Sequence, residues 1–201
     1  MRSYDASIIE GLLLTLNDDR TVNLSPMGVR FSTDGNMILL RPFKTSRTYQ
    51  NLARKAAGVF HITDDAVLIA RAALGDVDVL PPLTPIHGTD LGYLSDACQW
   101  HYLKVQSQDL SEARALFEMR VFNRGVIRNF MGFNRAKNSL VEAAILATRV
   151  GILPEEQITQ HLEFLQPSVE KTGGVSEQQA FSQLKTRILT KIAHAKNSTL
   201  D

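Results

Sequence analysis

The pattern of apolar residues changes along the chain, and this change constrains the fold more than any other feature. Three extended apolar runs come first, at residues 7–16, 22–31 and 37–40. Clusters of turn-forming residues separate these runs, so the sequence predicts two successive hairpins and hence antiparallel β structure. From residue 138 onward, apolar residues recur at helical spacing instead. The sequence therefore predicts an α+β protein, with a β domain in residues 1–135 and an α-helical extension in residues 136–201.

Between these two regions the sequence predicts a mixture of helices and strands. Residues 45–57 have helical spacing, with Ser46 or Thr45 as the N-cap. A second short helix is expected at 64–73, and further strands are expected at 59–62, 97–105 and 113–122. Prolines, glycines and acidic residues fill residues 75–96, which are expected to form a long loop or insertion over an active site. In the C-terminal region, Ser139 and Glu142 match a capping box that would begin a helix.

Composition narrows the class of protein. The 201 residues carry a net charge of +1, which gives no overall attraction to nucleic acid or anionic lipid. The single cysteine, Cys98, excludes an internal disulfide and a cysteine-cluster metal site, and it fits a reducing, cytoplasmic location. The five histidines show no metal-like spacing, so no metal is expected. No apolar run reaches the roughly 18–20 residues that span a bilayer, so no membrane contact is expected.

One segment has a strongly uneven charge. Residues 35–63 contain no acidic residue, whereas five cations occur there, at Arg41, Lys44, Arg47, Arg54 and Lys55. Hydroxyl groups at Thr45, Ser46 and Thr48 lie beside these cations, at the predicted start of a helix. Cations, hydroxyl donors and a helix N-terminus together suit a phosphate monoester. An ordinary solvated and capped helix start explains the same residues equally well.

A second candidate is the segment Asn23-Leu24-Ser25-Pro26-Met27-Gly28. Pro26 and Gly28 interrupt a predicted strand, so a bulge or an irregular, exposed stretch is expected at Ser25–Gly28. Backbone groups released from a sheet ladder can bind a planar heterocycle. A plain β-bulge is the alternative interpretation.

Taken in order, these motifs resemble those of a known family. The run Ile9-Glu10-Gly-Leu-Leu-Leu-Thr-Leu is followed by Asn23-Leu-Ser-Pro-Met-Gly, then by Lys44-Thr-x-x-Thr-x-x-Asn51-Leu and Gly58-Val-Phe. This order and spacing resemble the flavin-reductase-like FMN-binding split barrels. An Asn134-Arg135-Ala136 turn before a Glu-Ala-rich helix resembles a branch of unknown function with a helical C-terminal extension. The resemblance implies an antiparallel split β-barrel that binds FMN.

The resemblance also implies a site. The flavin ring would lie against the second strand, and the residues offering it hydrogen bonds would be Asn23, Leu24, Ser25, Pro26 and Met27. The phosphate would bind at Lys44–Thr48, with Thr45, Ser46 and Thr48 as donors, Lys44 or Arg47 as counter-charge, and Asn51 nearby. The family's proteins are usually homodimers with FMN at the interface. Arg135 and the 81–93 loop of the other subunit are then expected to complete each site.

The functional hypothesis follows from that cofactor. A flavin carries hydride or electrons itself, so the protein needs few catalytic side chains and none is assigned. A flavin-dependent oxidoreductase acting on a small molecule is the main expectation. The alternatives are a flavin carrier or sensor without turnover, and a flavin-free interaction protein that uses the basic 41–55 surface. Residues 120–137 carry five cations and three phenylalanines, but nucleic acid is not expected as a partner because the net charge is near zero and no RNA-binding signature is present.

Overall fold

The computed structural model describes residues 3–77 and 79–197, with the backbone alone for 195–197. The chain forms two compact units, each with its own core. The first, the barrel unit, contains the described residues up to 63 and residues 79–130. The second, the helical unit, contains residues 64–77 and the described residues from 131 onward.

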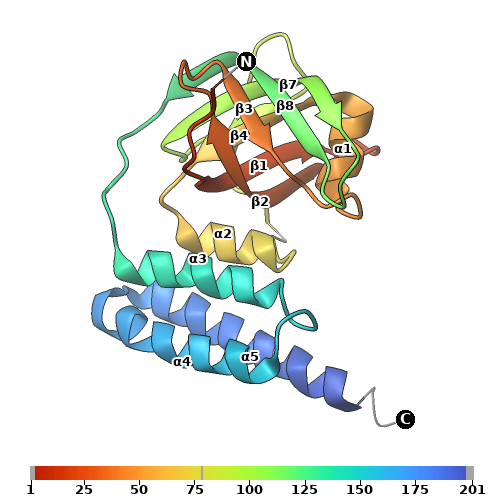
Figure 1. The fold of residues 1–201 in the computed structure, drawn as a ribbon. Coiled ribbons are helices and arrows are strands. Elements are labelled where there is room, and N and C mark those ends of the chain that lie inside the picture. Colours follow the sequence, from red (N-terminus) through yellow and green to blue (C-terminus); the bar gives the residue numbers. More distant parts are fainter. Residues whose placement is uncertain (1–2, 78, 198–201) are drawn as a thin grey trace. The chain divides into compact units, whose positions relative to one another are not determined.

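Six strands close the barrel, and all neighbouring pairs are antiparallel (Figure 1). The strands are β1 (Ile9–Leu16), β2 (Val22–Phe31), β3 (Met37–Leu40), β4 (Ala57–Ile62), β7 (Gln99–Asp109) and β8 (Leu116–Val126). Their order around the barrel is β1-β2-β3-β8-β7-β4. The predicted α+β fold with an antiparallel barrel is confirmed.

Alternating apolar side chains fill the barrel. Its core includes Leu13, Ile38, Phe60, Leu103 and Phe117, all of them 0% exposed. Each such side chain contributes roughly 1.5–3 kcal/mol by leaving water. A glycine makes room for the largest of them, since a Cβ at Gly11 would lie 2.6 Å from the ring of Phe60. The packing of this core therefore requires a glycine at position 11.

Helix α1 (Arg47–Lys55) lies at one end of the barrel (Figure 1). Ser46 caps it, since the Ser46 side chain accepts a hydrogen bond from the Tyr49 N–H, which confirms one of the two predicted caps. Leu52 packs in the barrel core, and the rings of Tyr49 and Phe117 lie 6.1 Å apart. The helix ends at Ala56, whose φ of 53° is left-handed.

The predicted interruption of β2 is wrong. Residues 22–29 pair with β1 without a register shift, and Pro26 lies opposite Leu12. On its other side β2 pairs with β3 only at Val29, Arg30 and Phe31. Residues 22–28 therefore form a strand edge, where a proline without an N–H disrupts no ladder. We call residues 22–28 the β2 edge.

The segment 79–98, which we call the excursion, is folded onto the barrel rather than being an open loop. It contains a hairpin of β5 (Leu83–Pro85) and β6 (Gly92–Leu94), and β6 lies against β4. Its buried side chains are Ile86, Leu91, Leu94, Ala97 and Cys98. The Cys98 N–H donates to the Ile62 carbonyl at 2.9 Å. Apolar burial explains why a segment rich in proline and glycine is ordered.

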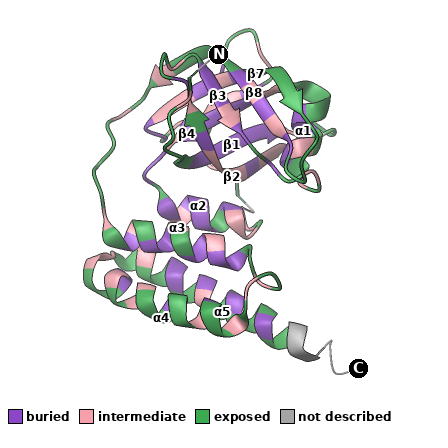
Figure 2. Cartoon of the chain, viewed as in Figure 1, coloured by how far each residue is buried: buried purple, intermediate pink, exposed green. Residues whose placement is uncertain are grey.

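Four helices form the helical unit, and their buried residues face one another (Figure 2). They are α2 (Ala66–Ala73), α3 (Arg135–Ala147), α4 (Glu155–Thr172) and α5 (Val175–Asn197). Helix α3 begins at Arg135 because Asn134 caps it, so the predicted start at Ser139 is wrong; Ser139 is buried within α3. Helix α2 packs against α3 and α5, so residues 64–77 group with the C-terminal helices. The predicted domain boundary between 135 and 136 stays a prediction.

None of the helices within residues 3–77 and 79–197 combines the length and the apolar character that crossing a membrane requires.

Candidate functional site

The two motifs found in the sequence meet where β2 lies beside the start of α1. The hydroxyls of Ser25 and Thr48 are hydrogen-bonded at 2.7 Å, although 23 residues separate them. Asn23 Nδ2 donates to Thr48 Oγ1 at 3.2 Å and to Thr15 Oγ1 at 3.1 Å. The structure therefore brings Asn23, Ser25 and Thr48 together.

A second amide joins the same group of side chains. Asn51 Nδ2 donates to Thr15 Oγ1 at 3.0 Å and to Asn17 Oδ1 at 2.9 Å. Thr15 is 0% exposed and accepts from both amides. The sequence analysis missed Thr15, although a polar residue two positions after the core residue Leu13 was a usable signal. We call Thr15, Asn23, Ser25, Thr48 and Asn51 the polar cluster.

The predicted phosphate donors differ in whether their hydroxyl groups already make hydrogen bonds within the protein. Ser46 Oγ donates to the Phe43 carbonyl at 2.7 Å while it caps α1, and the hydroxyl of buried Thr48 belongs to the polar cluster. By contrast, Thr45 is exposed, and its hydroxyl makes no hydrogen bond within the described part of the chain. The backbone N–H groups of Arg47 and Thr48 also have no partner among the described residues, as is usual in a first helical turn. The available donors are therefore the helix N-terminus and Thr45.

Cations surround this helix start. Lys44 Nζ donates to the Leu110 carbonyl in the β7–β8 turn, and Arg47 is exposed. The guanidinium of Arg114 lies 4.0 Å from the ring centre of Phe43. Arg114 was missed by the sequence analysis because it is remote in sequence, and the β7–β8 hairpin brings it here through a bridge to Phe43.

The charges at this end of the barrel affect nearby carboxyl groups only weakly. Hydrogen bonds from Thr21 lower the pKa of Asp19, and Arg47 adds a smaller effect. Hydrogen bonds from Ser111 lower the pKa of Asp109, and Lys44 again contributes least. Both carboxyl groups are fully exposed, so the cations stay available to an anionic ligand.

The β2 edge supplies the other half of the candidate site. Apart from the pairing with β1, the backbone of residues 22–28 makes no hydrogen bond within the described residues. Leu24 is buried, Pro26 is half-buried, and Met27 packs against the barrel core. This edge thus offers alternating N–H and C=O groups beside the polar cluster.

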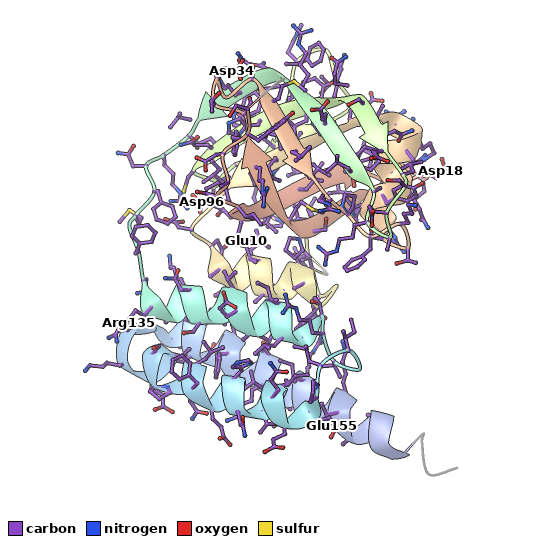
Figure 3. The ribbon with its side chains drawn as sticks, viewed as in Figure 1. Glu10, Asp18, Asp34, Asp96, Arg135 and Glu155 are labelled. Atoms are coloured by element: carbon purple, nitrogen blue, oxygen red, sulfur yellow. The ribbon has the colours of Figure 1, made fainter. Side chains whose placement is uncertain are left out.

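Arg135 lies outside the barrel unit. It is the first residue of α3, in the helical unit, and is exposed (Figure 3). Its contribution to a site stays a prediction.

Two histidines of the barrel unit, His61 and His101, are buried. His61 is 0% exposed; its Nδ1 lies 3.2 Å from the Leu12 carbonyl, and its Nε2 accepts from the Leu94 N–H at 3.0 Å. Burial lowers the pKa of His61 to about 4. Burial, helped by the charge of Arg124, lowers the pKa of His101 to about 4 as well. Among residues 3–77 and 79–197, no group of three or more histidine, cysteine or carboxylate side chains is placed to hold a metal ion.

The closed barrel is a flavin-reductase-like FMN-binding split-barrel fold, as comparison with solved structures shows. The chain belongs to the DUF447 family of proteins of unknown function. The model of that family's N-terminal domain matches residues 9–128, and a second DUF447 model matches residues 134–186. No protein among the curated sequences matches this chain.

Three solved structures illustrate the likeness. An FMN-bound DUF447 protein from Methanosarcina mazei has a TM-score of 0.76 at 21% identity, covering 91% of this chain and 96% of its own. An FMN-binding protein from Thermus thermophilus has a TM-score of 0.50 at 16% identity, covering 63% and 81%. A flavoredoxin from Methanosarcina acetivorans has a TM-score of 0.51 at 13% identity, covering 59% and 68%. The match to the M. mazei protein thus extends over both units of this chain.

Proposed function

We propose that this protein binds FMN between the β2 edge and the start of α1, and that it acts as a flavin-dependent oxidoreductase on a small molecule. The observation that carries the proposal is the 2.7 Å hydrogen bond between Ser25 and Thr48. It joins a strand edge that suits a heterocycle to a helix start that suits a phosphate. The FMN bound to the M. mazei protein of the same family supports the same cofactor.

The phosphate end of the ligand matches the helix start. The N–H groups of Arg47 and Thr48 are free within the described structure, and the N-terminal end of a helix attracts anions. Thr45 adds a hydroxyl donor, and Lys44, Arg47 and Arg114 supply positive charge. A phosphate dianion needs this combination of donors and cations.

The ring end of the ligand matches the β2 edge. A flavin's pyrimidine edge presents both hydrogen-bond donors and acceptors, and an unpaired strand edge presents both in alternation. Asn23 and Ser25 are held in place by Thr48, so this part of β2 is ordered before a ligand binds. When bound, the flavin would supply the redox chemistry, while the protein binds it, orients it and excludes water.

The site is proposed to be completed in a homodimer, with FMN at the interface. Arg135 and the 81–93 loop of a second copy are the proposed additional contacts. A measurement of mass in solution, with and without FMN, tests this part, since a monomer that binds FMN at full affinity contradicts a shared site.

The deciding experiment compares FMN with riboflavin, which lacks only the phosphate, by quenching of flavin fluorescence. We expect about one FMN per subunit. Replacing both Lys44 and Arg47 by alanine is expected to weaken FMN at least about tenfold, and to leave riboflavin affinity nearly unchanged. Thr48→Val is expected to weaken both ligands, because Thr48 also positions Asn23 and Ser25.

Arg30→Ala is the matched control, since Arg30 is an exposed cation on β2 beyond the proposed site. Equal loss of FMN and riboflavin in the Lys44 and Arg47 double variant would contradict the phosphate assignment. Failure of the wild-type protein to retain FMN would remove the proposed function altogether. Reduction of the FMN-loaded protein by NADH or NADPH, and oxidation by an added acceptor, then separates an enzyme from a carrier.

A further inference from the structure

The Asn51 side chain joins α1 to β1 and is only 4% exposed. Its Nδ2 donates to Thr15 Oγ1 at 3.0 Å and to Asn17 Oδ1 at 2.9 Å, so both amide hydrogens are used. Its Oδ1 lies 3.4 Å from Arg54 Nη2. The resemblance to the split barrels placed Asn51 near the phosphate, but this residue has no side-chain donor left for one.

A relay of hydrogen bonds from the β1–β2 turn fixes the direction of the Asn51 amide (Asp18 labels this turn in Figure 3). Hydrogen bonds from Thr21 lower the pKa of Asp19, so its carboxyl group is ionised at neutral pH. A carboxylate only accepts hydrogen bonds, so Thr21 donates its hydroxyl hydrogen to Asp19 Oδ1, 2.5 Å away. Thr21 Oγ1 in turn accepts from Asn17 Nδ2 at 2.9 Å, which turns Asn17 Oδ1 toward Asn51. Asn51 must therefore present its Nδ2 to this side, and not its Oδ1.

Thr15 connects Asn51 to Asn23. The buried Thr15 Oγ1 accepts from Asn51 Nδ2 at 3.0 Å and from Asn23 Nδ2 at 3.1 Å. Asn23 Nδ2 also donates to Thr48 Oγ1 at 3.2 Å, so the Asn23 amide is held through its nitrogen.

The oxygen of the Asn23 amide is available to a ligand. Asn23 Oδ1 has no hydrogen-bond partner among the described residues. Within that part of the chain, the buried side-chain polar atoms without a partner are limited to His101 Nδ1, so Asn23 Oδ1 is accessible from outside. It is an acceptor beside the β2 edge, where the flavin ring is proposed to bind. The oxidised flavin ring carries its N–H group at N3, in the pyrimidine edge, and this donor suits such an acceptor.

We infer that Asn51 is a positioning residue of the proposed FMN site. Through Thr15 it holds the Asn23 amide with its oxygen available to the flavin ring, and it does not touch the ligand itself. This inference rests on the proposed function. It differs from a role at the phosphate, because loss of a residue that positions the ring end weakens every flavin, with or without a phosphate.

The test is a double-mutant cycle in the full chain, with the Kd of FMN and of riboflavin measured by flavin fluorescence. Asn51→Ala is expected to weaken both flavins by the same factor, at least about fivefold. In a chain that already carries Asn23→Ala, the further change Asn51→Ala is expected to weaken them by less than about twofold, because Asn51 acts through Asn23. A merely structural role of Asn51 would add its full effect to that of Asn23→Ala.

Three further variants complete the design. Thr15→Val breaks the same link while α1 keeps Asn51, and it is expected to weaken both flavins as Asn51→Ala does. Thr15→Ser keeps the hydroxyl and is expected to retain the affinity. Asn123→Ala is the matched control, since Asn123 is an exposed residue of β8, and it is expected to leave both affinities unchanged.

NMR of the ligand-free protein gives a readout that needs no flavin. We expect the Nδ2 protons of Asn23 to exchange slowly with water in the wild type and in Asn123→Ala, and faster in Asn51→Ala. Unchanged exchange in Asn51→Ala overturns the inference.

The affinities can overturn the inference in three ways. A loss of FMN affinity alone would place Asn51 at the phosphate, unchanged affinities would give it no role in binding, and additive losses in the cycle would make its role structural. If the wild type binds neither flavin, the proposed function fails and this inference fails with it. If the wild type binds FMN but the variants break the expected pattern, only the inference fails.

Discussion

The polar cluster and the excursion both depend on side-chain hydrogen bonds, but in different ways. In the polar cluster, five neutral side chains share the hydrogen bonds, and Thr15 accepts from two amides at once. At the excursion, a single buried side chain of β4, His61, bridges the Leu12 carbonyl and the Leu94 N–H. The first arrangement is distributed and insensitive to pH. The second includes a titratable residue beside the backbone bond from Cys98 to Ile62, so the two regions are expected to fail under different conditions.

The largest expected effect is the loss of His61. His61→Ala leaves a cavity and deprives two buried backbone groups of their partner, so we expect the free energy of unfolding to fall by about 3–5 kcal/mol. Urea denaturation measures the loss, and hydrogen exchange is expected to show faster exchange at residues 83–94. The control is His87→Ala, since His87 is an exposed residue of the same segment. A loss below about 1 kcal/mol for His61→Ala would show that apolar packing alone holds the excursion.

Per histidine, lowering the pH is expected to have the next largest effect. Burial lowers the pKa of both His61 and His101 to about 4, from an ordinary value of 6.5. As pH falls from 6.5, the unfolded chain takes up these protons first, so stability present above pH 6.5 is lost progressively down to about pH 4. A single histidine shifted this far corresponds to on the order of 3 kcal/mol.

Urea denaturation at several pH values between 7.5 and 4 measures this slope. The polar cluster contains no titratable group, so it adds nothing to the slope. In His101→Gln the slope is expected to be smaller, because one of the two histidines is gone. A variant slope equal to that of the wild type would show that His101 does not contribute.

The smallest expected effect is at the polar cluster. Thr15→Val keeps the shape of the side chain but removes the acceptor that the Asn23 and Asn51 amides share. We therefore expect the free energy of unfolding to fall by about 1–2 kcal/mol. The loss stays small because Asn23 still bonds to Thr48, and Asn51 still bonds to Asn17. Thr15→Ser keeps the hydroxyl and is expected to recover most of the stability. If the loss at Thr15 matched the loss at His61, the distinction between distributed and concentrated contacts would not hold.

Local patterns were sufficient for most strands and for α1. The apolar run around Leu13 and the turn residues that follow predict β1, and Ser46 caps α1 through contacts within four residues. The predicted bulge in β2 failed because the effect of Pro26 depends on whether a neighbouring strand needs its N–H. The predicted start of α3 failed because Ser139 and Asn134 are both acceptable caps locally, and burial of Ser139 in the helical core decided between them.

For the candidate site, the sequence alone determined which residue types were available: a Pro-containing strand, hydroxyls and cations at a helix start, and the order that resembles a split barrel. Local chemistry was enough for these, because capping and alternation act over a few residues. Only the tertiary structure decided that Thr15 joins Asn23 to Asn51, that Arg114 lies near the cations of the helix start, and that Arg20 pairs with Asp90. Thr15 and Asn23 lie opposite one another in the β1–β2 hairpin, but the other contacts join residues far apart in the sequence, and such contacts leave no local pattern to read.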